Sequence, residues 1–288
     1  MAGGHGMTDA GPVVAVLEAS YRYPGGLLAL DRVSLEIAAG EVVGIAGSNG
    51  AGKSTLARLL NGLLRPTTGS VTIDGRDTRG REVHELARTV GLVFQHPRTQ
   101  LFARTVAEEL AFGPRNLGLT RDEVAARVAI VIGRFGLADV VGASPFDLPA
   151  PRRRLVAIAS ILTMEPRVLV LDEPTTGQDH RTSALIADLV RSLRDDGVAV
   201  ACVSHDMRLL AAVSSRVVTM TGGRVVADGR PSDVFADAAA LAAAGLQAPQ
   251  VTRLGAALPA RRGLPAVLSV ERMVAELLAA RAPRTGAG

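Results

Sequence analysis

The chain has 288 residues, of which 48% are hydrophobic and 21% charged, and its formal net charge is +4. This length and composition are typical of a globular protein with one large domain, or with a domain and an appendage. Because tryptophan is absent and only 3% of the residues are aromatic, the sequence offers no basic, aromatic surface that would stack on nucleic-acid bases. We therefore expect no nucleic-acid partner.

The sequence contains no segment long and apolar enough to be a membrane-spanning helix. Its longest stretch without a charged residue, 238–252, is shorter than the roughly 20 apolar residues that such a helix needs. Any link to a membrane is therefore expected to pass through a partner protein. The N-terminus lacks a secretory signal pattern, and residues 1–12 are predicted to be a disordered leader. The single cysteine, Cys202, cannot form an internal disulfide and suits a reducing cytoplasm.

Short apolar runs alternate with amphipathic segments along the chain, which predicts an α/β fold. Several of the runs are continuously apolar, as expected of parallel strands that are covered on both faces. The predicted strands are Val14–Glu18, Val33–Ile37, Val42–Ala46, Ser70–Ile73, Val90–Phe94, Val168–Asp172, Ala199–Ser204, Arg216–Thr221 and Arg224–Gly229.

In the middle of the chain the periodicity becomes helical, most clearly over Arg121–Phe135 and Leu155–Thr163. We therefore predict an α/β nucleotide-binding domain over residues 13–235 that contains a helical subdomain at about 96–165. The only basic triplet, Arg152–Arg154, lies in this region, and we expect it to be the solvated face of a helix.

After this domain the chain is rich in alanine, is interrupted by prolines and ends in a predicted helix, Val270–Arg281. We predict that residues 236–288 form a small C-terminal appendage.

The only lysine among the 32 basic residues is Lys53, which lies in a glycine-rich loop with the spacing G-x-x-x-x-G-K-S. A predicted strand precedes this loop and a predicted helix follows it. In such a loop, backbone N–H groups surround nucleotide phosphates, the lysine reaches the outer phosphates and the serine binds Mg²⁺. A compact ammonium fits this ring of amides better than a broad guanidinium does. The predicted binding residues for a nucleoside triphosphate are Gly47, Ser48, Asn49, Gly50, Ala51, Gly52, Lys53, Ser54 and Thr55.

Two acidic residues, Asp172 and Glu173, end the apolar run that begins at Val168. A carboxylate at a strand end beside the phosphate loop can hold Mg²⁺ through its waters, and we predict this role for Asp172. Glu173 points in another direction and is predicted to polarise an attacking water, a contribution typically worth about 10²–10⁴ in rate.

Three further side chains are predicted to lie near the nucleotide. His205 follows the next strand and is predicted to sense the γ-phosphate and orient the water. Gln95 follows the strand that ends at Phe94; it is predicted to ligate Mg²⁺ or contact the water, with an ordinary turn glutamine as the alternative. Tyr23 is predicted to stack on the base, with Tyr21 as the competing choice and a packing role open to both.

The chain resembles the ATP-binding subunits of ABC transporters, and most closely their energy-coupling-factor and cobalt-import branch. The segments 93–102 and 109–114 are similar to that branch around its glutamine loop, and 245–252 is similar to the start of its C-terminal region. The site residues occur in the order of that family: Lys53, Gln95, Asp172, Glu173 and His205.

This resemblance implies a P-loop ABC cassette with two lobes, which pairs head to tail with a second ATPase and encloses two ATP molecules with Mg²⁺. It implies that closing and opening of the pair drives integral membrane coupling and substrate-binding subunits. The C-terminal appendage is then expected to contribute to the pairing. The implied function is that of a peripheral ATPase at the cytoplasmic face of the cell membrane, which energises import of a micronutrient such as a vitamin or a metal ion.

One loop departs from the family pattern. Where the family has the signature Leu-Ser-Gly-Gly-Gln, this chain has Leu-Pro-Ala-Pro-Arg at 148–152. Pro149 lacks the hydroxyl and the N–H that would bind the γ-phosphate in the facing subunit, and Pro151 also lacks an N–H. Each lost bond to a charged group is worth roughly 1.5–3 kcal/mol. The helix itself is expected to persist, because proline is tolerated in a first turn. Gln178 replaces a leucine that is usual in the family.

These departures predict an asymmetric heterodimer. In a homodimer both ATP sites would face the altered signature, whereas a partner with an intact signature would complete the site that contains Lys53. The alternative is a nucleotide-binding subunit that does not hydrolyse ATP and serves assembly or regulation. The intact Asp172 and Glu173 favour hydrolysis, and the two prolines favour the alternative.

Overall fold

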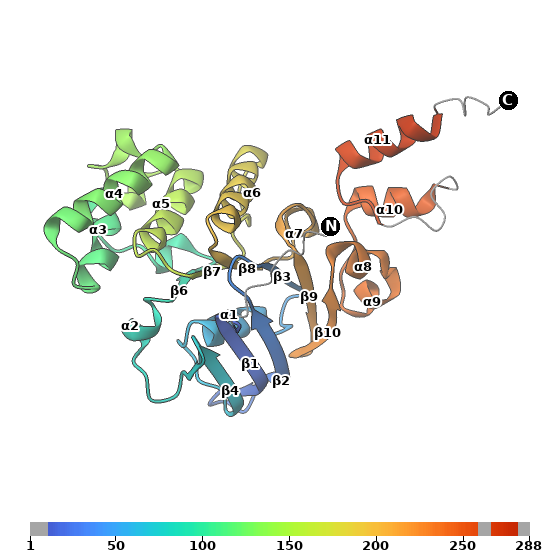
Figure 1. The fold of residues 1–288 in the computed structure, drawn as a ribbon, viewed down its shortest axis with the longest axis horizontal. Helices are drawn as coiled ribbons and strands as arrows, with labels where there is room; N and C mark the ends of the chain where they lie inside the picture. The colour runs from blue at the N-terminus through green and yellow to red at the C-terminus, as the bar shows by residue number, and fades with distance from the viewer. Residues whose placement is uncertain (1–10, 259–265, 282–288) are drawn as a thin grey trace, which may run out of the picture.

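A six-stranded sheet forms the centre of the computed structural model, which describes residues 11–258 and 266–281 (Figure 1). Its strand order is β10-β9-β3-β8-β7-β6, and the strands are parallel except for β10, which pairs antiparallel with β9. The α/β fold class is therefore confirmed. The strands are β3 (Val42–Gly47), β6 (Val90–Val93), β7 (Val168–Asp172), β8 (Ala199–Val203), β9 (Arg216–Thr221) and β10 (Arg224–Gly229).

The central sheet is buried on both faces, which explains its continuously apolar strands. Every residue of β3, β7 and β8 is buried. In β3, Val43 and Ile45 pack in one hydrophobic cluster, while Val42 and Ala46 pack in another on the opposite face, as the alternation of a strand requires. The helices α6 (His180–Asp195) and α7 (Met207–Val213) belong to the second cluster.

A second, antiparallel sheet covers α1 (Lys53–Leu60), so that this helix lies between two sheets (Figure 1). Its strand order is β2-β1-β4-β5, and its strands are β1 (Val14–Arg22), β2 (Leu28–Ile37), β4 (Thr68–Ile73) and β5 (Arg76–Asp77). The first two strands are longer than predicted. Glu18 and Arg32 have positive φ and the register shifts along the pair, and such irregularities interrupt the apolar alternation that marks a strand.

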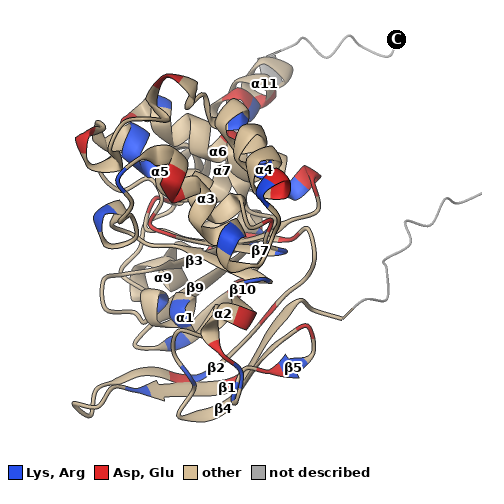
Figure 2. Cartoon of the chain, turned by 90° about the vertical axis from the view of Figure 1, so that its left-hand side faces the viewer, with Lys and Arg blue, Asp and Glu red and all other residues tan. Residues whose placement is uncertain are grey.

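The helices between β6 and β7 form a lobe with its own hydrophobic cluster. They are α3 (Val106–Asn116), α4 (Arg121–Phe135) and α5 (Ala150–Leu162), and a short α2 (Val83–Leu86) precedes β6. We call α3, α4 and α5 the helical lobe. Both α3 and α4 begin with a capping box, in which Thr105 and Thr120 accept from the backbone N–H three residues on. Residues of both charge signs are interspersed over this lobe (Figure 2).

The first turn of α5 differs from the sequence prediction. The helix begins at Ala150, five residues before the predicted start at Leu155, with Pro149 at the N-cap and Pro151 in the first turn. Both prolines are compatible with helix here because the first N–H groups of a helix have no intrahelical acceptor. The expectation that the helix persists is confirmed.

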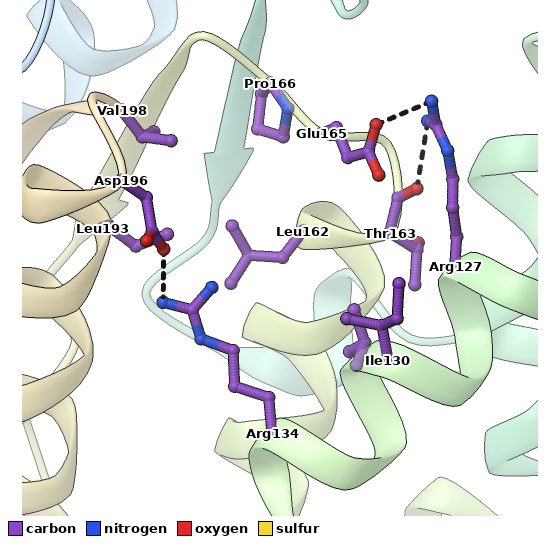
Figure 3. Close-up of a pocket in the computed structure, with 11 residues that line it drawn as sticks. Arg127, Ile130, Arg134, Leu162, Thr163, Glu165, Pro166, Leu193, Asp196 and Val198 are labelled. Carbon is purple, nitrogen blue, oxygen red and sulfur yellow. Dashed lines mark hydrogen bonds and ion pairs between the residues drawn. The ribbon is translucent and has the colours of Figure 1, made fainter.

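A cavity lies where the helical lobe meets the central sheet and α6 (Figure 3). Two ion pairs flank its apolar floor: Arg127 lies 2.7 Å from Glu165, and Arg134 lies 3.0 Å from Asp196. Arg127 and Arg134 belong to α4, while Glu165 and Asp196 follow α5 and α6. These pairs connect the helical lobe to the rest of the domain at a place remote from the phosphate loop.

The described residues of the C-terminal region contain four helices, and the last two project away from the sheets (Figure 1). The final helix spans Val270–Arg281, as predicted. The helices are α8 (Pro231–Ala236), α9 (Ala238–Ala243), α10 (Gln250–Ala257) and α11 (Val270–Arg281). Most of the predicted leader lies outside the described residues. Over 11–258 and 266–281, none of the helices has the length and apolar character needed to span a membrane.

Candidate nucleotide-binding site

The predicted phosphate loop connects the buried strand β3 to the start of α1. Gly50 and Gly52 both have positive φ, and a side chain on Gly52 would meet the carbonyl oxygen of Ala29 at 2.5 Å. Only glycine fits this path. The N-cap of α1 makes no side-chain hydrogen bond, and the first turn holds no acidic residue. The positive end of α1 is therefore available to an anion such as a phosphate.

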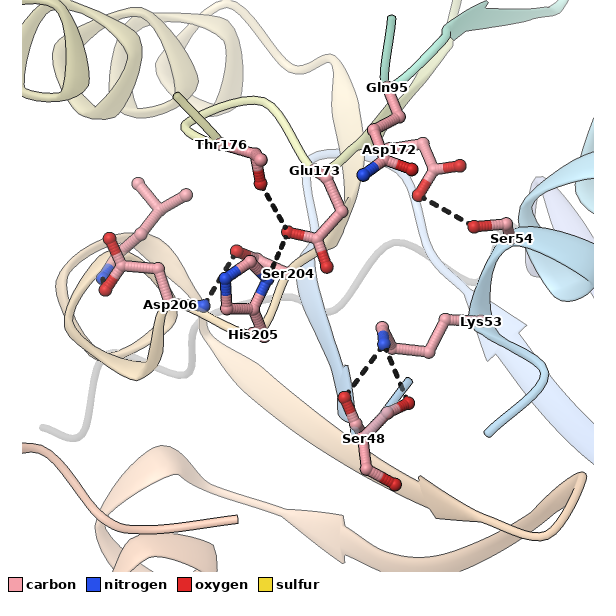
Figure 4. A network of polar contacts seen from close by, with 12 residues as sticks. Ser48, Lys53, Ser54, Gln95, Asp172, Glu173, Thr176, Ser204, His205 and Asp206 are labelled. Carbon is pink, nitrogen blue, oxygen red and sulfur yellow. Dashed lines mark hydrogen bonds and ion pairs between the residues drawn. The ribbon is translucent and has the colours of Figure 1, made fainter. Parts of the chain in front are cut away.

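Lys53 is nearly buried, and its ammonium points into the loop (Figure 4). Its Nζ donates to the carbonyl oxygens of Gly47 at 2.8 Å and Ser48 at 3.1 Å. Because an ammonium has three donors, one remains for a phosphate oxygen. The predicted contact residues Gly47 and Ser48 thus hold the lysine through their carbonyl groups.

Ser54 connects the phosphate loop to the end of β7. Its hydroxyl donates to Oδ1 of Asp172 at 3.2 Å (Figure 4). Burial is the main cause that raises the pKa of Asp172; the Ser54 hydrogen bond opposes this shift, and the neighbouring Glu173 adds to it. A buried carboxylate beside a hydroxyl is a suitable pair of oxygen ligands for Mg²⁺.

Glu173 is held in an unusual backbone conformation at the same strand end. It is nearly buried and has a φ of 51°, a conformation that a residue with a side chain rarely adopts. Its Oε2 lies 2.7 Å from Nδ1 of His205 and 3.1 Å from the Thr176 hydroxyl (Figure 4). The structure therefore brings His205 to Glu173, because β7 and β8 are neighbouring parallel strands and both residues follow their carboxyl ends.

One pocket contains the phosphate loop, Tyr23, Gln95 and Glu173 together. The Tyr23 hydroxyl lies 3.1 Å from that of Thr55, which ties the aromatic ring to α1. Tyr21 packs edge-on against Tyr23 and against the hydrophobic core, and it does not line the pocket. Of the two tyrosines, Tyr23 therefore faces the site.

Sequence reasoning missed several residues around this pocket. Leu27, Leu28 and Ala29 form part of its wall, next to Tyr23. They follow the turn Tyr23-Pro24-Gly25-Gly26, which returns β2 alongside β1, and this turn was the available signal. Thr176, which binds Glu173, carried no signal in the sequence.

The arginine triplet is not a solvated helix face, contrary to the sequence expectation. Arg154 is 2% exposed and donates to the carbonyl oxygens of Phe94 and Gln95. Arg153 donates to three carbonyl groups of the preceding turn, including that of Leu148. Arg152 pairs with Asp139 at 2.6 Å. Arg154 lies three and four residues before buried positions of α5, and this helical spacing was a usable signal of its burial.

Comparison with known proteins agrees with this geometry. Residues 30–176 match the ABC transporter family. The chain is 45% identical over 264 residues to the energy-coupling factor transporter ATP-binding protein EcfA2 of Symbiobacterium thermophilum, covering 90% of this chain and 92% of that protein.

Two solved structures are similar in fold as well as in sequence. The structure of cbiO1 from Clostridium perfringens, part of the ABC transporter complex cbiONQ, is 33% identical with a TM-score of 0.73, and covers 85% of this chain and 98% of that one. A dimeric ATP-binding cassette, MJ0796, in a post-hydrolysis state with ADP and phosphate, is 27% identical with a TM-score of 0.70. The match covers 76% of this chain and 98% of that one. This chain therefore belongs to the ABC transporter family as an ATP-binding subunit of the energy-coupling-factor type, and it is a transport ATPase.

Proposed function

We propose that this chain hydrolyses ATP to energise a membrane importer of a micronutrient, and that it works as one half of an asymmetric ATPase heterodimer. The observation that carries the proposal is a contrast within the chain. The site around Lys53, Asp172 and Glu173 has its hydrogen bonds in place, whereas the loop at 148–152 lacks the groups with which this family binds the partner's nucleotide.

The geometry of the altered loop supports this asymmetry. Pro149 caps α5 without a side-chain hydrogen bond, and neither Pro149 nor Pro151 has an N–H to donate. The nearby guanidinium of Arg153 donates to the carbonyl groups of Leu148 in the loop and of Pro145 and Phe146 in the turn before it. The loop is thus held in shape while it offers few donors to a phosphate. A nucleotide bound by the partner and facing this loop would be held weakly.

Pairing with a second ATPase has support from one surface of the C-terminal region. Val270, Val274 and Leu278 follow each other at intervals of four on α11, and each is about half exposed or more. This spacing places them on one face of the helix. We propose that this face packs against the second ATPase; that ATP-binding cassettes can pair is supported by the similar cassette whose structure is dimeric.

Contact with integral membrane subunits is proposed at the helical lobe. Phe102 and Phe112 are 57% and 45% exposed and pack edge to face, with ring centroids 4.6 Å apart. Exposed aromatic pairs of this kind are enriched where proteins bind one another. We propose that a cytoplasmic segment of a membrane coupling subunit covers them, which would hold the chain at the cytoplasmic face of the membrane.

For the chemistry we propose Mg²⁺ as the metal that accompanies ATP, held by Ser54, Asp172 and Gln95. Mg²⁺ would neutralise charge on the β- and γ-phosphates. Glu173 would then polarise the water that attacks the γ-phosphate, while His205 orients Glu173 and contacts the phosphate. Tyr23 would stack on adenine.

The test compares the tagged chain alone with the complex recovered by that tag from detergent-solubilised membranes. We expect the chain alone to bind ATP with little turnover, and the complex to contain a second ATPase with an intact signature and to hydrolyse ATP. A homodimer of the purified chain that hydrolyses ATP at the rate of the complex would contradict the heterodimer. Nucleotide binding without turnover in the complete complex would contradict the catalytic role.

A further inference from the structure

We infer that Arg154 is a positioning residue for Gln95, because its guanidinium holds the backbone at Gln95 to α5. This inference rests on the proposed role of Gln95 in the nucleotide site. The guanidinium of Arg154 is buried and makes two hydrogen bonds, which go to the backbone on both sides of the Gln95 α-carbon.

The first step is the geometry of these two hydrogen bonds. Nη1 of Arg154 lies 2.9 Å from the carbonyl oxygen of Phe94, and Nη2 binds the carbonyl oxygen of Gln95. These carbonyl groups belong to the peptide groups immediately before and after the Gln95 α-carbon. Since peptide groups are planar, fixing both of them fixes the φ and ψ of Gln95 and hence the direction in which its Cα–Cβ bond leaves the backbone.

A second contact ties the same backbone to α5. The amide of Gln100 accepts from the N–H of Phe94 at 3.1 Å and donates to the carbonyl oxygen of Ala157 at 2.6 Å. Ala157 lies three residues after Arg154, so both contacts come from one face of α5. The segment that leaves β6 is therefore attached to α5 at two points.

The other end of this segment is attached to the helical lobe as well. Glu109 of α3 is 4% exposed, and its Oε2 accepts from the N–H groups of Phe102 and Ala103 at 2.9 and 2.8 Å. Residues 94–103 are thus held at both ends by buried polar groups of the helical lobe.

The energetic cost of Arg154 argues for a role beyond packing. Within the described part of the chain, no carboxylate is close enough to its guanidinium for an ion pair, and its Nε has no hydrogen-bond partner. Burial lowers the pKa of Arg154, and the more distant Asp172 carboxylate only opposes this shift. A buried charge without a paired acid is destabilising, and an apolar side chain of similar length would avoid that cost. What the planar guanidinium adds is a fork that holds two neighbouring carbonyl groups at a fixed separation.

The position of Arg154 gives this contact a functional consequence. It lies two residues after the altered loop at 148–152, on the helix that this loop begins. In the proposed heterodimer the loop faces the partner's nucleotide. The helix α5 would therefore connect two nucleotide sites. Its first turn faces the partner's nucleotide, and its Arg154 holds Gln95 in the chain's own site.

The experiment measures ATP hydrolysis by the complex recovered with the tagged chain, with Arg154→Met, Arg154→Lys, Gln95→Ala and the double variant Gln95→Ala/Arg154→Met. We expect Arg154→Met to lower kcat by up to about 100-fold, the loss that follows from misplacing a group by about 1 Å. The KM for ATP should stay close to that of the unsubstituted chain. Arg154→Lys keeps the charge but loses the planar fork, so that its ammonium can hold only one of the two carbonyl groups and should recover part of kcat.

The double variant separates positioning from a structural role. If Arg154 acts through Gln95, Arg154→Met should lower kcat no further once Gln95 is alanine. Losses that multiply would overturn the inference, as would full turnover of Arg154→Met. Should Arg154→Met not fold, as judged by thermal unfolding, the same comparison is made with Arg154→Lys.

Two controls complete the design. Arg134→Met removes another arginine that connects the helical lobe to the domain, but at the remote cavity of Figure 3, and should leave kcat unchanged. Glu173→Gln in the same complex distinguishes a failure of the proposed function from a failure of the positioning inference. If it leaves hydrolysis intact, the proposed function fails; if it abolishes hydrolysis while the Arg154 variants keep full turnover, only the positioning inference fails.

Discussion

Nδ1 of His205 lies 2.7 Å from Oε2 of Glu173, although the two residues follow different strands and are 32 positions apart. The Glu173 side chain is nearly buried, while that of His205 is 58% exposed. His205 and Thr176 both form hydrogen bonds to Oε2 of Glu173. In the described part of the chain, Oε1 has no hydrogen-bond partner. The arrangement fixes the direction of the carboxylate and leaves one oxygen for a water molecule.

The first prediction concerns Glu173. We expect Glu173→Gln to lower the turnover of the proposed heterodimer by about 10²–10⁴, the usual contribution of a general base, and to leave ATP binding intact. Phosphate release and equilibrium binding of ATP would be measured on the same preparation. Undiminished hydrolysis would show that another residue activates the water.

The second prediction concerns His205. Because it orients Glu173 through a hydrogen bond, His205→Ala should reduce kcat less than Glu173→Gln does. Adding Thr176→Ala should reduce kcat further, since both donors to Oε2 are then lost. Single-turnover hydrolysis would measure both effects. A loss in His205→Ala that exceeds the loss in Glu173→Gln would show that His205, and not Glu173, makes the larger contribution to hydrolysis.

The third prediction concerns the single lysine. Lys53→Arg keeps the positive charge, yet the broad guanidinium does not fit between the carbonyl groups of Gly47 and Ser48. We expect a loss of ATP affinity by about tenfold or more, which corresponds to about 1.4 kcal/mol. Arg58→Lys, on the exposed side of α1, is the matched control and should bind ATP normally. ATP binding by Lys53→Arg at full affinity would argue against a tight amide ring.

The fourth prediction concerns Asp172 and pH. Its pKa is raised in the folded chain, mainly by burial. An acid with a raised folded-state pKa destabilises the fold when it is ionised, and this penalty is absent below its unfolded-state pKa of about 3.9. We therefore expect Asp172→Asn to raise the Tm of the nucleotide-free chain at pH 7, and the gain to vanish as the pH falls towards about 4.

Thermal unfolding at several pH values, with and without ATP and Mg²⁺, would test both halves of that expectation. The Asp172→Asn chain should gain less Tm from added Mg²⁺ in the presence of ATP than the unsubstituted chain does, because one oxygen ligand has lost its charge. A Tm gain that persists unchanged at low pH would show that the effect is not due to ionisation.

The fifth prediction concerns the altered signature loop. Replacing residues 149–152 by Ser-Gly-Gly-Gln restores the hydroxyl and N–H donors that the prolines remove. In the complex with the second ATPase we expect hydrolysis to rise, because the site facing this loop becomes competent. The purified substituted chain should also gain activity as a homodimer. Unchanged rates in both preparations would show that the loop does not limit turnover.

Much of this protein was determined by local sequence patterns. The α/β fold class followed from continuous apolar strands, and the phosphate loop followed from glycines whose spacing has few other uses. Asp172 and Glu173 were found because they end an apolar strand. In each case the signal lies within about ten residues, so that one sequence window contains it.

The tertiary structure alone decided which distant groups meet. Nothing near Thr176 or Arg154 in the sequence indicates that they bind Glu173 and the backbone at Gln95. The arginine triplet shows the reason most clearly. Three identical residues in a row have different surroundings because a helix turns each by about 100°, and what lies opposite each one depends on segments up to 60 positions away. From the sequence we expected all three arginines to be solvated, whereas tertiary packing buries Arg154.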